Sequence, residues 1–397
     1  MRHWFRAIAL ALLLTSLGAA LSVRGGQAVP LYATRTGLMC GNCHFDPNGG
    51  GPRKEFGFMY ARNRHSLTPE DSTSQWHDLD VVNRLGDNVP IYIGVNQRFM
   101  LLANGTSDTQ RFDQVGFFSM ENAFHLTFQP HSKLTLVYTR DGFDSGSTTR
   151  DAFGMITAGP WNGYFKAGRF RTPFGLRMDD HTVATRNSFL DFYSGRSFLP
   201  YDPRNPDMGL ELGAQGSRWF GRAAFTDGAN HPLAPEGRAQ AKTLKLGYQT
   251  SWHQGAVSIY DDFRGGSAGG GPAGLRATRW GYYGLFHVGR IDALGELDAG
   301  TDEAVTGDKT NLLAGFAELD YPPQRWINFR VRYDHLELDR SSDPAVRDLN
   351  TFDRYSLEGE VVPVPFAELR WTVRRIDAKS SSLPDETQEY LQFHFSY

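Results

Sequence analysis

Apolar and polar residues alternate in Ile327-Asn328-Phe329-Arg330-Val331-Arg332-Tyr333-Asp334. A period of two is typical of a β-strand that has one apolar and one polar face. The same alternation recurs at 133–138, 243–248 and 367–374, and more loosely at 118–128. It fits a soluble antiparallel sandwich as well as a transmembrane β-barrel, because arginines on the polar face suit either a solvated outer face or a water-filled lumen.

The connections between these segments favour the barrel. Seven tight turns are expected near Pro130, Trp161, Ser217, His253, Arg290, Pro323 and Pro363. They alternate with eight longer polar or Gly-rich loops at about 104–110, 142–150, 171–207, 227–240, 264–275, 301–308, 339–350 and 377–387. Regular alternation of short and long connections is typical of up-and-down barrels of bacterial outer membranes. The sequence therefore predicts an all-β fold, a transmembrane antiparallel barrel of about sixteen strands over residues 90–397.

The end of the chain and its composition agree with this fold class. Residues 391–397 alternate and end on an aromatic residue, Tyr397, as the last strands of outer-membrane barrels do. The chain contains 43 Gly, 28 Phe, 16 Tyr and 8 Trp, and its net charge of -3 gives no sign of a nucleic-acid partner. Loop 171–207 is the longest, and we expect it to fold into the lumen, which a barrel of this size leaves wide enough for a plug.

The N-terminus carries an export signal. Arg2 and Arg6 precede an apolar run at 7–21, and small residues follow it. This pattern predicts a signal peptide over residues 1–28, because the apolar run is too short to span a membrane.

The two cysteines of the chain lie together in Cys40-Gly41-Asn42-Cys43-His44. This spacing attaches haem through two thioethers, with the histidine as axial ligand of the iron. A disulfide or a redox CxxC is the alternative, but a bridge across so short a ring is strained and no βαβ pattern surrounds the motif. We therefore expect one haem c on Cys40 and Cys43, with His44 as proximal ligand, in a mostly helical or irregular segment at 29–67, followed by a linker at 68–89.

The second axial ligand is left open by the sequence. Met59 and His65 both follow the motif at reachable separations, and an open sixth position is the remaining alternative. A Met ligand raises the reduction potential of a haem, whereas a second His usually lowers it.

Acidic residues suggest a second kind of metal site. Asp179, Asp180 and His181 could coordinate ferrous iron within the long loop, although a salt-bridged network that fixes the loop is the simpler interpretation. The same two interpretations apply to the lumen-facing carboxylates Glu121 and Glu368.

The order of these parts resembles the outer-membrane cytochrome-porin fusions of iron-oxidising bacteria, in which a short monohaem segment precedes a porin-like barrel. Residues 34–40, Thr-Arg-Thr-Gly-Leu-Met-Cys, are similar to the Arg-x-Thr-Gly run of that family, whereas residues 45–51 are richer in glycine. The resemblance implies an outer-membrane electron conduit, with the haem segment at the periplasmic side or within the lumen. It implies electrons taken from extracellular ferrous iron or another reductant and delivered to a periplasmic cytochrome or copper protein, with outer-membrane lipid around the barrel.

Two other function classes compete with the conduit. A substrate-transporting porin would conduct solutes and carry the haem as an accessory plug. A peroxidase-like haem enzyme would need acid-base groups beside an open iron site, and the short haem segment offers few of them.

Overall fold

The computed structural model describes residues 30–86, 88–106, 112–142, 148–178, 180, 182–186, 197–201, 206–228, 241–264, 275–304 and 306–397. The predicted signal peptide lies outside these residues. The described helices are α2 (Pro30–Thr36), α3 (Cys40–Cys43), α4 (Glu55–Arg62) and α5 (Pro344–Leu349). Among them, no helix has the length and apolar character needed to cross a membrane.

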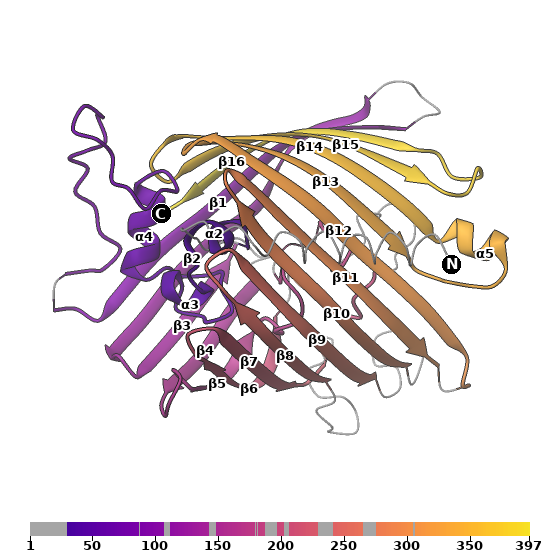
Figure 1. The fold of residues 1–397 in the computed structure, drawn as a ribbon, viewed down its shortest axis with the longest axis horizontal. Coiled ribbons are helices and arrows are strands. Elements are labelled where there is room, and N and C mark those ends of the chain that lie inside the picture. Colours follow the sequence, from indigo (N-terminus) through magenta and orange to yellow (C-terminus); the bar gives the residue numbers. More distant parts are fainter. Residues whose placement is uncertain are drawn as a thin grey trace.

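Sixteen strands in the described part of the chain form one closed antiparallel barrel (Figure 1). Each strand pairs with its neighbours in sequence, and β1 pairs with β16 from Asn96–Ser396 to Thr106–Glu386, which closes the ring. The prediction of about sixteen strands over residues 90–397 is confirmed. The strands are β1 Ile91–Thr106, β2 Phe112–His131, β3 Leu134–Asp141, β4 Thr148–Thr157, β5 Tyr164–Phe170, β6 Asp207–Gln215, β7 Trp219–Thr226, β8 Ala241–Gln249, β9 His253–Arg264, β10 Leu275–Val288, β11 Ile291–Glu303, β12 Lys309–Gln324, β13 Ile327–Glu337, β14 Thr351–Val364, β15 Ala367–Ala378 and β16 Glu386–Ser396.

In β13 the apolar residues of the alternating pattern face outward and the polar residues face the lumen. Phe329 and Val331 are 52% and 57% exposed, whereas Arg330 and Arg332 are 6% and 3% exposed. A sandwich would bury the apolar face, so this pattern identifies a barrel with an apolar outer surface and a polar interior. In the lumen Arg330 donates to Asp320 at 2.9 Å and to Glu358 at 3.0 Å, so the interior charges are paired rather than simply solvated.

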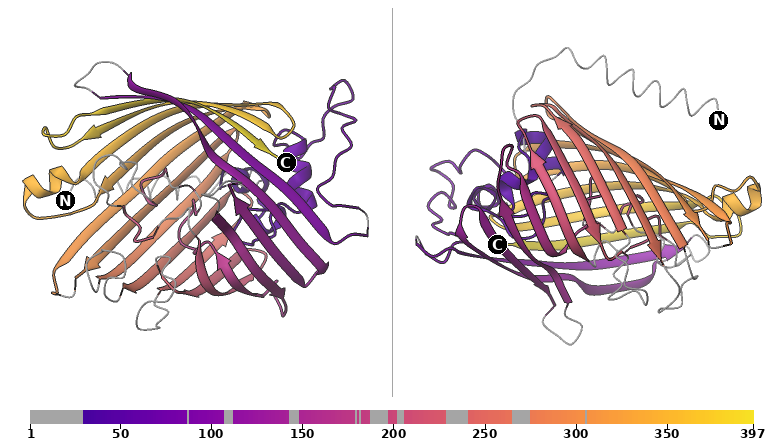
Figure 2. Two further views of the ribbon diagram at one scale, coloured as in Figure 1. Left: turned by 180° about the vertical axis from the view of Figure 1, so that it is seen from behind. Right: turned by 90° about the horizontal axis from the view of Figure 1, so that it is seen from below.

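The two ends of the barrel differ. The seven short connections fall where the sequence predicts them, between β2 and β3 and at every second pair thereafter. Helices α2, α3 and α4 and the C-terminus lie at the end with these short turns, and α5 lies at the opposite end (Figures 1 and 2). In porin-like barrels the short turns face the periplasm.

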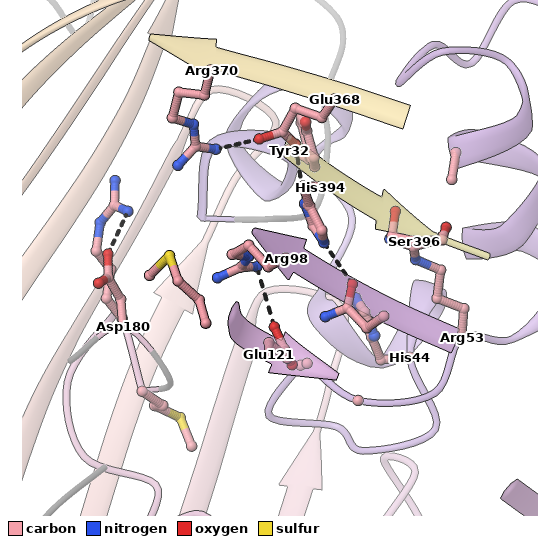
Figure 3. Close-up of a pocket in the computed structure, with 18 of the residues that line it drawn as sticks. Tyr32, His44, Arg53, Arg98, Glu121, Asp180, Glu368, Arg370, His394 and Ser396 are labelled. Carbon is pink, nitrogen blue, oxygen red and sulfur yellow. Dashed lines mark hydrogen bonds and ion pairs between the residues drawn. The ribbon is translucent and has the colours of Figure 1, made fainter. Parts of the chain in front are cut away.

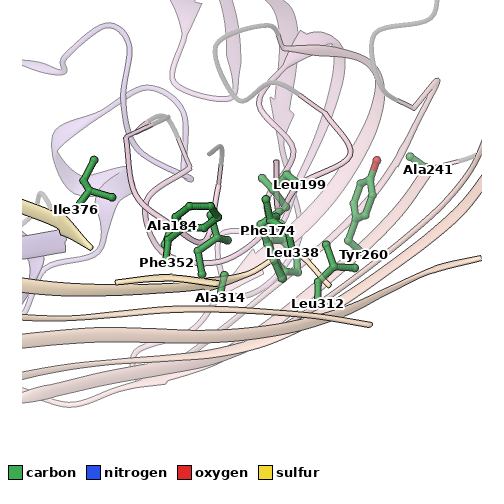
Figure 4. Close-up of a cluster of buried hydrophobic side chains, with 12 residues drawn as sticks. Phe174, Ala184, Leu199, Ala241, Tyr260, Leu312, Ala314, Leu338, Phe352 and Ile376 are labelled. Carbon is green, nitrogen blue, oxygen red and sulfur yellow. The ribbon is translucent and has the colours of Figure 1, made fainter. Parts of the chain in front are cut away.

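The described part of loop 171–207 lies inside the lumen, as expected. Phe174, Ala184 and Leu199 pack against inward-facing side chains of the wall, among them Tyr260, Leu312, Ala314, Phe352 and Ile376 (Figure 4). Arg186 fixes the loop further by donating to Glu296 at 2.7 Å, and both side chains are almost fully buried. The described part of this loop therefore narrows the lumen, in addition to the N-terminal helices.

Candidate functional site

The Cys40–His44 motif forms the short helix α3 and its C-terminal cap. The cap amide of His44 donates to the Cys40 carbonyl at 2.9 Å, and Lys54 N donates to the Cys43 carbonyl at 2.8 Å. Helix α4 crosses so close to α3 that a Cβ at Gly57 would overlap the Cys43 carbonyl oxygen. The glycine thus sets the distance between the two helices that surround the motif.

A cavity of about 610 Å³ opens beside the motif within the barrel (Figure 3). Cys40, Cys43 and His44 all line it. The volume lies in the range of about 300–1,000 Å³ that is usual for small-molecule and cofactor sites. Phe58 and Ala61 of α4 also line the cavity, and both are almost completely buried, so its helical side is largely apolar.

These residues fit a covalently attached haem. Cys40 and Cys43 are both free thiols, and no disulfide joins them in this part of the chain. Gly49 adopts φ +90°, and a Cβ there would lie 3.3 Å from Cys40 Sγ, so glycine leaves open the space in front of this sulfur. Burial raises the pKa of Cys43 to about 11, which keeps its thiol neutral before any thioether forms.

The motif is tied to the barrel wall on several sides. Arg35 of α2 donates to Asp292 at 2.5 Å, Arg53 donates to the Ser396 carbonyl at 2.6 Å, and Lys166 Nζ lies 3.0 Å from Asp46 Oδ2. These contacts reach β11, β16 and β5, which are far apart around the barrel. The N-terminal segment around the motif is therefore held inside the mouth of the lumen.

The structure separates the two predicted distal ligands. His65 lines the cavity, whereas Met59, which lies within α4, does not. Arg64 and His65 both have positive φ, 51° and 58°, so the chain makes a left-handed turn directly after α4, and the His65 side chain lines the cavity. Burial lowers the pKa of His65 to about 3, so its imidazole is neutral and able to coordinate a metal.

Other potential axial ligands come from the barrel and the loop. His125, His394, Met100, Met120 and Met178 also line the cavity. Sequence reasoning missed them as ligands because they are far from the motif in the chain. His125 and His394 lie on the inward face of strands with an alternating pattern, and this position is the sequence signal by which they could have been identified.

The predicted iron site at Asp179–His181 is only partly visible. Asp179 and His181 lie outside the described residues. Asp180 lines the cavity, and its carboxylate accepts from Arg177 at 3.3 Å and from Thr182 N at 2.9 Å. For Asp180 these contacts agree with the alternative of a salt-bridged network that fixes the loop.

No protein-family model and no curated protein matches the chain. Solved structures do match. The anion-selective porin of Comamonas acidovorans superimposes with a TM-score of 0.59 at 9% identity, over 77% of this chain and 99% of the porin. The chain has a porin-like fold. A loop-deletion mutant of the outer-membrane protein OmpT of Vibrio cholerae gives a TM-score of 0.57 at 12% identity, over 78% and 100% of the two chains. The outer-membrane channel DcaP of Acinetobacter baumannii gives 0.52 at 12% identity, over 78% and 97%.

Proposed function

We propose that this chain is an outer-membrane electron conduit, in which a haem c bound at Cys40, Cys43 and His44 takes electrons from an extracellular donor and passes them to a periplasmic carrier. One observation carries the proposal. The three residues of a haem-attachment motif line one cavity inside a porin-like barrel, and the apolar side chains of α4 line it with them. A haem bound there supplies a one-electron carrier.

The chain's own residues hold and shield this carrier. The sulfurs of Cys40 and Cys43 would supply the covalent links to a haem, and His44 would supply a nitrogen ligand to its iron. Phe58 and Ala61 exclude water from the helical side of the cavity, and the charged wall on the other side includes Arg98, which is paired with Glu121 at 3.6 Å. Burial of a haem generally tunes its reduction potential, so this enclosure supports an electron-transfer role.

The position of the cavity supports the direction of flow. Helices α3 and α4, whose residues line the cavity, lie at the end with the short turns (Figure 1), which faces the periplasm in barrels of this type. A periplasmic cytochrome or copper protein is the acceptor that this position favours. Ferrous iron is the donor that we propose, and it would approach through the lumen, past the 171–207 loop.

A substrate-transporting porin is the second candidate. The similar solved structures include an anion-selective porin and an outer-membrane channel, and this observation favours transport. The described part of the loop and the N-terminal helices occupy the lumen and support the conduit instead.

Reconstituted liposomes separate the two candidates. Vesicles are loaded with an impermeant oxidant and exposed to external ferrous iron. If the protein is a conduit, the wild type should oxidise the external iron at least about tenfold faster than a His44→Ala variant. It should also carry little ion current. Equal rates for the two proteins, together with a large ion current, would favour the porin.

A further inference from the structure

We propose that His65, Glu360 and Glu368 form a binding site for one divalent first-row transition cation at the edge of the haem cavity. One coordinating atom from each residue can be chosen so that all three lie within 4.8 Å of one another. A single ion at ordinary ligand distances can bridge atoms that are this close.

Three separate elements bring these side chains together. His65 follows α4, Glu360 lies near the end of β14, and Glu368 lies at the start of β15. Glu360 is 6% exposed, and all three residues line the cavity. A cation there would link the haem segment to the barrel wall.

One hydrogen bond to His65 is of the kind that orients a metal-binding histidine. The Tyr32 hydroxyl contacts Nδ1 of His65, and in the tautomer in which Nδ1–H donates to this hydroxyl, Nε2 is the nitrogen for the cation. Metal-binding histidines almost always engage their other ring nitrogen in this way, and the contact fixes both the tautomer and the ring orientation. Tyr32 and Tyr60 also pack against the imidazole ring, with centroids 4.6 and 5.9 Å away.

A second imidazole supports Glu368. His394 is the register partner of Glu368 across β15 and β16, and its Nδ1 lies 3.5 Å from Glu368 Oε2. Its Nε2 lies 2.5 Å from Asn96 Oδ1, so this ring is also held in place. With both of its ring nitrogens in contact, His394 is a residue that orients the Glu368 carboxylate.

Arg370 is the resident positive charge that a cation must compete with. Its Nη2 donates to Glu360 at 2.9 Å and to Glu368 at 2.8 Å. One guanidinium thus serves two carboxylates, so a bound cation would share both of them with Arg370. These two contacts use one oxygen of each carboxylate, Glu360 Oε2 and Glu368 Oε1. The second oxygen of each has lone pairs with which to ligate, and Glu368 Oε2 would also keep its contact with His394 Nδ1.

The donor set selects the class of ion. Imidazole with carboxylates suits ferrous iron, manganese and similar divalent ions, whereas magnesium and calcium prefer oxygen ligands alone. Only the choice of ferrous iron as the natural ion rests on the proposed function. With His65 in this site, it would not be a ligand of the proposed haem.

Manganese binding tests the site. Mn²⁺ is titrated into the purified full-length protein in detergent, and the electron paramagnetic resonance signal of free Mn²⁺ is followed. We expect one ion per chain, affinity reduced about tenfold or more in Glu368→Gln and His65→Gln, and tighter binding in Arg370→Gln. Glu303→Gln removes a carboxylate that pairs with Lys309 on the exposed loop end and serves as the matched control.

Two results would overturn the inference: no binding to the wild type, or equal affinity in the wild type and in both ligand variants. His65 lies outside the strands, so His65→Gln leaves the barrel intact and remains informative if Glu368→Gln does not fold. The haem spectrum of each sample is recorded separately. Normal Mn²⁺ binding in a protein that never carries haem would contradict the proposed function and leave the cation site standing.

Discussion

Lys166 Nζ, buried in the wall strand β5, lies 3.0 Å from Oδ2 of Asp46, which stands two residues after His44. The same amine lies 3.0 Å from Glu211 Oε2 on β6, and Asn48 donates to Glu211 at 2.9 Å. The ion pair between Lys166 and Asp46 fixes the loop after the Cys40–His44 motif to the barrel. A buried ion pair adds little net stability, but removing one partner leaves a buried charge without compensation and typically costs about 3–5 kcal/mol.

Lys166→Met should loosen this loop without unfolding the barrel. Asp46 and Glu211 then remain buried without their cation, and we expect a lower ratio of haem to protein after maturation. Haem content per chain measures the effect, and heat-modifiable gel mobility reports on the barrel. Lys309→Met removes an exposed lysine that pairs with Glu303 and should leave haem content unchanged. Full haem content in Lys166→Met would show that the pair does not position the motif.

Gly57→Ala should disturb the packing of the haem segment. The new methyl group would overlap the Cys43 carbonyl, so α4 must move away from α3. We expect a destabilisation of about 1–3 kcal/mol, as for other overpacked sites, and altered haem bands. Gly116→Ala is the control, because a Cβ there meets nothing within 4 Å. Wild-type spectra and stability in Gly57→Ala would contradict the close contact.

The contact between the linker and the barrel should depend on pH. Glu70 accepts from Arg64 at 2.7 Å and from Arg325, in the β12–β13 turn, at 2.8 Å. The hydrogen bond from Arg64 holds the pKa of Glu70 below its ordinary value of 4.5. A lowered pKa means that the folded state favours the ionised carboxylate. The stabilisation is therefore complete above about pH 4.5 and is lost as the pH falls below that value.

Hydrogen exchange of residues 66–86, corrected for intrinsic rates, measures this dependence. Glu70→Gln should exchange faster than the wild type at pH 7, and the difference should vanish at strongly acidic pH. Glu55→Gln, at an exposed position on α4, should match the wild type throughout. A difference between Glu70→Gln and the wild type that persists unchanged in acid would exclude this role for Glu70.

The barrel could be predicted from the sequence because lipid and lumen impose a period of two on every strand. Phe329 and Val331 had to be apolar to face lipid, and Arg330 and Arg332 had to be polar to face the interior. Connection lengths then gave the strand number. Which charge pairs with which could not be predicted, because Arg330 meets Asp320 and Glu358 only through the register of three strands.

The candidate site was predictable only where it is local in sequence. Cys40, Cys43 and His44 follow from a five-residue spacing. The exclusion of Met59 from the cavity depends on how α4 packs, and the entry of His65 depends on two left-handed residues that no sequence signal marks. The cluster of His65 with Glu360 requires the closed barrel itself.

The haem should be attached covalently to the chain. The wild type should keep one haem per chain after acid-acetone extraction, because thioethers to Cys40 and Cys43 survive acid. Single replacement of either cysteine by serine should weaken or abolish retention. Haem that is fully extracted from the wild type, or never incorporated, would refute haem attachment through the motif.

Reduction of the purified, fully oxidised protein by ferrous iron, followed at the haem absorption bands, tests the central claim most directly. An electron conduit with one haem c should take up one electron per chain, and the same spectral change should appear with a chemical reductant. A protein with no haem bands, or with a haem that a chemical reductant reduces and ferrous iron leaves oxidised, would contradict the account.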